Sequence, residues 1–545
     1  MLDAEKILQR HAHQRMLTSA RLNSRHPIVR FIVALLLAVL VPGRAMTAAA
    51  SSCASLSALA VPNATITLAQ AVEAGPFTVP GPDAGSPRTL PAFCRVAATL
   101  KPTADSDIKI EVWMPTAGWN GKYQAVGNGA FNGSIAYPAM MAALARGYAT
   151  SSTDTGHTGN SARFALGHPE KVIDFGWRAV HEMTLASKAI IAAHYESAPR
   201  FSYWNGCSAG GRQAMKEAQR FPADFDGIIA GAPGLDWTGR AAQAVRVMKA
   251  LESNEAARLT PAQAQLLHLA AISACDALDG VKDGLIADPA RCDVDPSVLR
   301  CKGGDEGTCL SAAQIETARL IYSPMNNPKT KRQIAGLAPG SELGWTPTGW
   351  TASARASGVD QFRFLVFNDP LWDAQRFAGG SDVAIAEESD HDIINALDPN
   401  LKPFLDRGGK LIQYHGWSDP QISPFNSTQY YASVLEAIGS QIDVRNSYRL
   451  FMVPGMGHCG GGEGPNTFDM VGALEQWVEH GQAPDQILAA HATNGPSTGL
   501  GAGPSTGLAP GRVDRTRPLC PYPQIAVYNG TGSLDEAASF ICKAR

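Results

Sequence analysis

One serine in the chain has the neighbours that a catalytic nucleophile requires. Ser208 is the centre of Gly206-Cys207-Ser208-Ala209-Gly210, with the short apolar run Phe201–Trp204 before it and Gly211–Ala218 after it. The first run predicts a strand and the second a helix, so Ser208 stands on a sharp turn between them. Glycines allow such a turn and let another segment approach closely. We expect the turn to aim the Ser208 hydroxyl at a substrate carbonyl.

The same five-residue pattern occurs twice more, around Ser497 and Ser505. Both serines lie in a repeat rich in Gly, Pro, Ser and Thr, without an apolar run before it or a helical run after it. Such a composition is typical of a surface loop. The context therefore favours Ser208.

A serine nucleophile requires a base, and the base requires a carboxylate that orients it. Asp419 follows the apolar run Leu411–Tyr414, and His458 follows Leu450–Val453. In α/β-hydrolases the triad comes in the order Ser, Asp, His, on turns after strands. Taken singly, Asp419 also fits a turn before proline and His458 a surface loop, but the shared order favours a triad. Two further histidines are weaker candidates, which we expect to line a pocket or to serve the structure: His415 and His157.

Two cysteines flank the expected triad. Cys207 precedes the nucleophile, and Cys459 follows the base. If Ser208 and His458 are within hydrogen-bond reach, the two cysteines are close enough for a disulfide, which needs Cα atoms roughly 4.4–6.8 Å apart. The alternative is a pair of buried free thiols.

Acyl transfer also requires two backbone amides that stabilise the developing oxyanion. One should be the amide of Ala209, the residue after the nucleophile. For the other we expect Gly129, in the loop Gly127-Asn128-Gly129-Ala130. The alternative is that this loop is an ordinary glycine turn.

Three motifs together resemble the tannase and feruloyl esterase family, which also includes a terephthalate monoester hydrolase: Gly206–Arg212, Trp417–Pro420 and Gly457–Cys459. The resemblance covers residues 53 to 545, nearly the whole chain after the N-terminal segment. It implies an α/β-hydrolase fold with a mainly parallel sheet and a large inserted lid domain. It implies a small-molecule substrate, an ester of an aromatic acid such as a feruloyl, caffeoyl or galloyl ester. It also implies five disulfides: Cys53–Cys94, Cys207–Cys459, Cys275–Cys292, Cys301–Cys309 and Cys520–Cys542.

Several carboxylates gather in the segment from Cys275 to Asp288. Closely spaced carboxylates repel one another unless a cation lies among them, and calcium takes six to eight oxygen ligands in such sites. The spacing is not that of an EF-hand. The resemblance implies a structural Ca²⁺ in the lid, held by the side chains of Asp276, Asp279 and Asp283 and by the carbonyls of Val281 and Leu285. The alternative is a solvated acidic loop.

Strand and helix patterns alternate along much of the chain, as expected for a parallel sheet covered on both faces. The predicted strands are Ile108–Pro115, Tyr123–Val126, Tyr148–Ser152, Phe225–Gly231, Gly409–Tyr414 and Tyr448–Val453, and the predicted helices include His181–Tyr195 and Gln429–Ile438. The rhythm breaks near residue 235 and resumes near residue 409. We therefore expect a hydrolase domain in two parts, 51–234 and 399–545, with a lid domain at 235–398. Four tryptophans of the lid suit either an aromatic acyl group or a core: Trp237, Trp345, Trp350 and Trp372.

The N-terminal segment has the pattern of a secretory signal peptide. Arginines, the last of them Arg30, precede the apolar run Phe31–Val41, and small residues follow at Ala45–Ala50. This pattern predicts a signal over residues 1–50, cleavage between Ala45 and Ser52, and Met16 as an alternative start. We expect a secreted or periplasmic protein with no membrane contact after cleavage, and a monomer.

Composition limits the remaining classes of function. The chain has 545 residues, a net charge of −3 and no basic stripe, so nucleic acid is not an expected partner. A serine esterase is the favoured interpretation. The alternatives are a terephthalate monoester hydrolase, a peptidase with the same triad, and a non-catalytic exported binding protein on a hydrolase scaffold.

Overall fold

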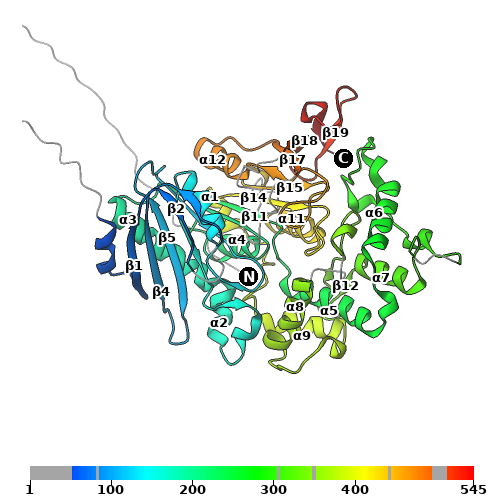
Figure 1. Ribbon diagram of the computed structural model, residues 1–545, viewed down its shortest axis with the longest axis horizontal. Helices are drawn as coiled ribbons and strands as arrows, with labels where there is room; N and C mark the ends of the chain where they lie inside the picture. Colours follow the sequence, from blue (N-terminus) through cyan, green and yellow to red (C-terminus); the bar gives the residue numbers. More distant parts are fainter. Residues whose placement is uncertain are drawn as a thin grey trace, which may run out of the picture. The chain divides into compact units, whose positions relative to one another are not determined.

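A nine-stranded sheet forms the centre of the computed structural model, which describes residues 52–80, 85–303, 307–345, 352–439, 444–493 and 512–544 (Figure 1). The strand order is β1-β4-β5-β8-β6-β10-β11-β14-β15. The pairs from β1 to β8 are antiparallel, and every pair from β8 to β15 is parallel. The bounds are β1 Ala64–Val72, β4 Phe93–Leu100, β5 Ile108–Pro115, β8 Ala149–Thr153, β6 Lys122–Val126, β10 Phe201–Cys207, β11 Gly227–Gly231, β14 Lys410–Gly416 and β15 Tyr448–Val453.

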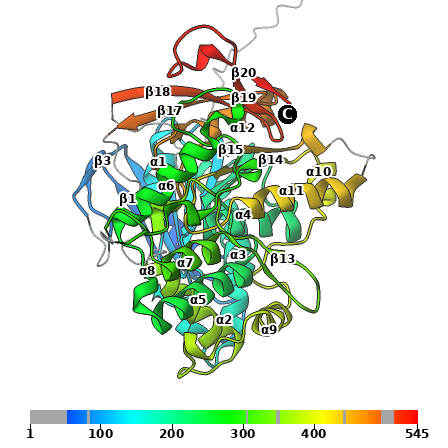
Figure 2. The ribbon, with the colours of Figure 1, turned by 90° about the vertical axis from the view of Figure 1, so that its right-hand side faces the viewer.

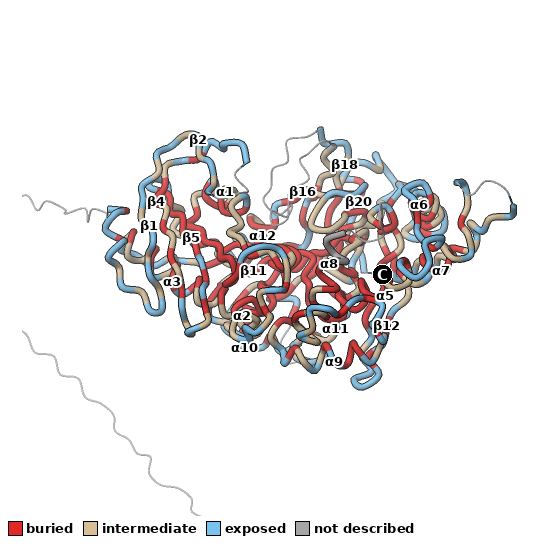
Figure 3. The backbone as a smooth tube through the Cα atoms, turned by 60° about the horizontal axis from the view of Figure 1, so that its bottom comes forward, coloured by how far each residue is buried: buried red, intermediate tan, exposed pale blue. Residues whose placement is uncertain are grey.

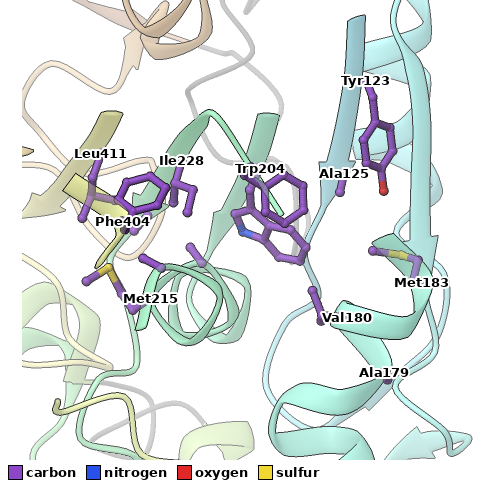
Figure 4. Packing of buried hydrophobic residues seen from close by; sticks show 14 of the residues in the cluster. Tyr123, Ala125, Ala179, Val180, Met183, Trp204, Met215, Ile228, Phe404 and Leu411 are labelled. Carbon is purple, nitrogen blue, oxygen red and sulfur yellow. The ribbon is translucent and has the colours of Figure 1, made fainter. Parts of the chain in front are cut away.

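The parallel strands are apolar on both faces because helices cover both. In β10, Trp204 packs into the core on one face and its neighbour Tyr203 into the core on the other. One face is covered by α3 (Ala179–Tyr195), α4 (Ala209–Arg220), α10 (Lys402–Asp406) and α11 (Phe425–Ile438), and the other by α1 (Tyr137–Ala145) and α12 (Met470–His480). Figure 4 shows the first of these cores, where Met215 of α4 lies beneath the strands that carry Trp204, Ile228 and Leu411.

The sequence pattern predicted this part of the fold closely. The strand expected at Ile108–Pro115 has those bounds as β5, and each other predicted strand overlaps a strand of the sheet. The helix expected at His181–Tyr195 is α3, which begins two residues earlier at Ala179. The mainly parallel sheet is as predicted.

Between β11 and β14 lies a mainly helical insertion, residues 235–398. Its helices are α5 (Trp237–Ser253), α6 (Pro261–Cys275), α7 (Ala312–Tyr322), α8 (Ala352–Asp360) and α9 (Gly380–Asp390), and its strand pair is β12 (Met325–Asn326) with β13 (Gln333–Ile334). The insertion has apolar clusters of its own, while buried residues continue into it along the first part of α5 (Figure 3). Residues 50–545 nevertheless form one compact unit, so separate domain boundaries stay a prediction.

Strands also follow β15, although the sequence pattern predicts none after Tyr448–Val453. A second sheet has the order β16-β17-β18, and β19 pairs with β20 (Figure 2). Their bounds are β16 Thr467–Phe468, β17 Ile487–Thr493, β18 Arg512–Leu519, β19 Ile525–Tyr528 and β20 Phe540–Lys543. Apolar side chains of this second sheet, such as Phe468 and Leu519, belong to one buried apolar cluster with Phe451 of β15. Short elements complete the fold: β2 Gly75–Phe77, β3 Arg88–Leu90, β7 Asn132–Gly133, β9 Gly159–Asn160 and α2 Pro169–Ile173.

All ten cysteines lie in five disulfides, and these are the pairs that the family resemblance implies: Cys53–Cys94, Cys207–Cys459, Cys275–Cys292, Cys301–Cys309 and Cys520–Cys542. Within the described ranges, no helix is both long and apolar enough to cross a bilayer. The predicted signal peptide at 1–50 lies outside the described residues.

Candidate active site

The turn that carries Ser208 is as sharp as the sequence predicts. β10 ends at Cys207 and α4 begins at Ala209, so Ser208 alone makes the turn, with φ 64° and ψ −120°. The Ser208 amide donates to the carbonyl of Gly231 at 2.9 Å. A Cβ on Gly206 would lie 2.6 Å from the carbonyl carbon and oxygen of Gly210, which no side chain tolerates. Glycine at this position therefore permits the turn.

Ser208, His458 and Asp419 form one hydrogen-bonded chain. The Ser208 Oγ lies 2.9 Å from His458 Nε2, and His458 Nδ1 lies 2.7 Å from Asp419 Oδ2. Asp419 is fully buried, while 9% of the surface of Ser208 is exposed to solvent. Asp419 lies after β14, His458 after β15 and Ser208 after β10. These three strands are neighbours or near neighbours in the sheet. The predicted residues thus meet at the carboxyl ends of the parallel strands.

Asp419 is held as a carboxylate by several donors. Its Oδ1 accepts from the amides of Gln421 at 2.7 Å and Ile422 at 3.0 Å. Burial alone would raise its pKa, but the neighbouring His458 and His415 outweigh burial and hold the pKa of Asp419 well below its usual range. A charged Asp419 can orient His458 and stabilise its protonated form.

His415 is a second partner of Asp419. Its Nε2 lies 3.1 Å from Asp419 Oδ2, and its Nδ1 lies 2.7 Å from the Ser427 hydroxyl. The ring is fully buried. The sequence offered this histidine only as pocket lining or structure, and its spacing of four residues from Asp419 was the signal that could have identified the contact.

The loops that carry Asp419 and His458 pack tightly on each other. Ser418 donates its amide to the carbonyl of Met456 at 3.0 Å. A Cβ on Gly416 would lie 2.2 Å from the same Met456 oxygen, so this strand end requires glycine. A disulfide ties the His458 loop to the Ser208 turn: Cys207 and Cys459 have Cα atoms 6.0 Å apart.

The loop expected to supply the second oxyanion amide is anchored to α4. The carbonyl of Asn128 accepts from Gly210 N at 2.8 Å, and the Asn128 amide donates to Gln213 Oε1 at 3.1 Å. Gly129 is the next residue. Among the hydrogen bonds of the described residues, none uses the amide of Gly129 or Ala209. Both amides therefore remain available to a substrate oxygen.

His157 supports this loop and does not join the triad. Its Nε2 lies 2.7 Å from the carbonyl oxygen of Phe131, and its ring stacks on that of Phe164 with 4.0 Å between the ring centroids. The lid tryptophans fit the core alternative, since three are almost fully buried: Trp237, Trp345 and Trp372. Three residues discussed above lie outside the described ones: Trp350, Ser497 and Ser505.

The acidic loop folds on itself and against the C-terminal strand β18. Asp276 accepts from the amides of Asp283 and Gly284, and Asp283 pairs with Arg517 at 2.5 Å. Burial, and then repulsion from Asp283 and Asp276, raise the pKa of Asp279 to about 6. In the described part of the chain, no hydrogen bond ends on the carbonyl oxygen of Val281 or Leu285. Carboxylate and carbonyl oxygens are the donors that calcium prefers, so the chemistry of this set fits that ion, with Arg517 as a second cation at Asp283.

Comparisons with known proteins agree with this geometry. The family model "Tannase and feruloyl esterase" matches residues 94–361 and 373–543. An "uncharacterized esterase" from Xanthomonas campestris pv. campestris is 38% identical over 573 residues, covering 96% of this chain and 95% of that protein. A "probable feruloyl esterase B-2" from Aspergillus terreus is 33% identical over 466 residues, covering 82% of this chain and 86% of that protein.

Solved structures lead to the same result. The crystal structure of feruloyl esterase B from Aspergillus oryzae superposes with a TM-score of 0.82 at 32% identity, covering 91% of this chain and 100% of that one. The tannin acyl hydrolase from Aspergillus niger has a TM-score of 0.69 at 22% identity, covering 91% and 97%, which shows a shared fold. The protein therefore has the α/β-hydrolase fold and belongs to the tannase and feruloyl esterase family of carboxylic ester hydrolases.

Proposed function

We propose that the chain hydrolyses esters of aromatic carboxylic acids through an acyl-enzyme on Ser208. The observation that carries this proposal is the unbroken chain from Ser208 Oγ to His458 Nε2 at 2.9 Å and from His458 Nδ1 to Asp419 Oδ2 at 2.7 Å. Each contact has the distance at which a hydroxyl, an imidazole and a carboxylate transfer or stabilise a proton.

The reaction proceeds in two steps. His458 takes the proton of Ser208 as its Oγ attacks the ester carbonyl, and Asp419 stabilises the imidazolium that forms. The amides of Ala209 and Gly129 donate to the oxyanion. His458 then protonates the leaving alcohol, so the acyl group remains on Ser208. A water molecule that gives its proton to His458 attacks the acyl-enzyme; His458 then returns the proton to Ser208 Oγ as the acid leaves.

An aromatic acyl group is supported by the relatives of the chain. Proteins at 33% and 32% identity are named probable feruloyl esterase B-2 and feruloyl esterase B. Hydroxycinnamoyl esters are therefore the class that we propose.

A substrate panel tests this class. Methyl ferulate and chlorogenate should be hydrolysed with higher kcat/KM than methyl gallate or a terephthalate monoester, and a peptide should not be cleaved. Equal or higher kcat/KM on methyl gallate or the terephthalate monoester would contradict the hydroxycinnamoyl class. If no ester were hydrolysed, the result would support a binding protein.

The nucleophile is tested by Ser208→Ala. This change should lower kcat by on the order of 10⁴-fold or more, because the remaining triad members cannot act without it. Circular dichroism should show an unchanged fold. The matched control is Ser497→Ala, in a pentapeptide of the same pattern, which should keep full activity. Near-normal turnover of Ser208→Ala would move the reaction to another residue.

We further propose that the acidic loop binds a structural Ca²⁺ through Asp276, Asp279 and Asp283 and the carbonyls of Val281 and Leu285. The ion would neutralise the carboxylates and so stabilise this loop of the insertion. It has no part in the ester chemistry.

We also propose export to an oxidising compartment as a monomer. The support is five disulfides in a chain whose N-terminal sequence has the signal pattern. Mass spectrometry of the exported protein tests cleavage between Ala45 and Ser52, and sedimentation tests the monomer. A retained N-terminus or a stable dimer would contradict these two proposals.

A further inference from the structure

Three side chains that could bind a metal ion converge away from the triad. His181 lies on α3, Glu217 on α4, and Asp224 in the turn between α4 and β11. One ligand atom of each lies within 4.8 Å of those of the other two. Nothing in the proposed ester chemistry uses these residues.

Glu217 is the member that requires an explanation. It is 1% exposed, and neither of its carboxylate oxygens has a hydrogen-bond partner. A buried polar group without a partner is destabilising, and more so if it is charged. Burial first, and the neighbouring Asp224 second, raise the pKa of Glu217 well above its usual range. Among the described ion pairs, none involves Glu217, and Lys188 donates to the backbone carbonyl of Asp224.

The histidine of the cluster is already oriented. The His181 Nδ1 lies 2.7 Å from Asp224 Oδ2, and the ring stacks on Phe221 with 3.8 Å between centroids and 13° between planes. Its side chain is 23% exposed, so an ion can reach the cluster from solvent on this side.

We propose that His181, Glu217 and Asp224 bind a divalent transition-metal ion of the zinc class. A neutral imidazole and two carboxylates are ligands that zinc takes, and two negative charges balance the charge of the ion. The ion replaces the proton between Nδ1 and Asp224 Oδ2 and gives the orphaned Glu217 carboxylate a partner. Water fills the remaining coordination position.

The ion would act on stability, since it is remote from the reacting atoms. Glu217 lies on α4, nine residues after Ser208, which is about 13 Å at 1.5 Å per residue. The ion links α3, α4 and the turn between α4 and β11.

Zinc binding by the chelator-treated, dialysed full-length enzyme tests the proposal. Isothermal titration with ZnCl₂ should show one site whose Kd weakens by roughly 100-fold or more in Glu217→Gln, because loss of even an outer-shell partner costs 10–100-fold. Zinc should raise the Tm of the wild type and leave that of Glu217→Gln unmoved. Since Glu217 is buried, His181→Ala, at a partly exposed ring, is the second variant and should show the same losses.

Two controls isolate the site. Asp279→Asn alters the acidic loop and should keep the zinc site, which separates it from the proposed calcium site. The exposed pairs His168–Asp105 and His491–Asp514 remain in every variant, so zinc bound to them cancels in the comparison. Absence of zinc binding beyond that background, or equal Kd values in the wild type and both variants, would overturn the proposal; Glu217 would then be a protonated carboxyl that donates to Asp224.

Discussion

The disulfide between Cys207 and Cys459 should matter more for turnover than for folding. It joins the residue before Ser208 to the residue after His458. Apart from the contact between Ser208 and His458 themselves, no hydrogen bond of the described residues joins the two turns. The variant Cys207→Ala/Cys459→Ala therefore leaves the position of His458 against Ser208 without a covalent restraint.

The stability cost follows from the length of the loop that the bond closes. The cysteines are 252 residues apart, and the chain-entropy relation gives about 5.5 kcal/mol at 25 °C for a loop of this length. The short bridge Cys301–Cys309 has a separation of 8, for which the same relation gives about 2.5 kcal/mol. Cys207→Ala/Cys459→Ala keeps four disulfides and the apolar cores on both faces of the sheet, so we expect it to fold with a lower Tm.

Turnover should respond more strongly. Misplacement of a reacting group by about 1 Å can cost roughly 10²-fold in rate, so kcat of Cys207→Ala/Cys459→Ala should fall by about this factor. The assay is ester hydrolysis at a temperature where circular dichroism shows both variants folded. Cys301→Ala/Cys309→Ala, far from the triad in sequence, should keep kcat within about twofold. Equal losses of kcat in the two variants would refute the positioning role of the bond between Cys207 and Cys459.

The other predictions concern the acidic loop and the second histidine. Chelation with EDTA should lower Tm more than room-temperature activity, and CaCl₂ added after dialysis should raise Tm again, since an ion at 100 times its Kd stabilises the native state by about 2.7 kcal/mol. Asp279→Asn should lower Tm and abolish the recovery with CaCl₂, whereas an unmoved Tm and no metal by elemental analysis would contradict the calcium proposal. His415→Ala should lower kcat about tenfold with KM little changed, because a hydrogen bond to a charged group contributes about 1.5–3 kcal/mol and the bond from His415 orients Asp419. Steady-state kinetics measure kcat and KM separately, and an unchanged kcat would show that His415 serves packing alone.

The parts of the fold that could be predicted are those whose sequence follows local rules. β5 alternates apolar and charged residues before a proline, and β10, β11, β14 and β15 are short, largely apolar runs, which are the patterns of strands. The order of Ser208, Asp419 and His458 was readable because each follows such a strand directly or within five residues.

The missed parts depend on distant contacts. β18 has the sequence Arg-Val-Asp-Arg-Thr-Arg-Pro-Leu, whose charges and proline argue against a strand. It forms at the edge of its sheet, where Arg515 and Arg517 meet Asp283, 232 and 234 residues away. No local pattern encodes contacts at such separations. The same holds for the cluster of His181, Glu217 and Asp224. These residues form no sequence motif, and only the packing of α3 against α4 and the following turn brings them together.

The order of the disulfides along the chain has a consequence for biosynthesis. Between Cys207 and Cys459 lie four cysteines that pair among themselves, at separations of 17 and 8. Because a chain emerges from its N-terminus, Cys207 is exposed long before Cys459 is made, and pairing in order of emergence would join it to Cys275. Thiol–disulfide exchange can repair such a mismatch. Heterologous production should therefore succeed where a disulfide isomerase accompanies the oxidant, and a host that supplies an oxidant alone should accumulate mispaired chains.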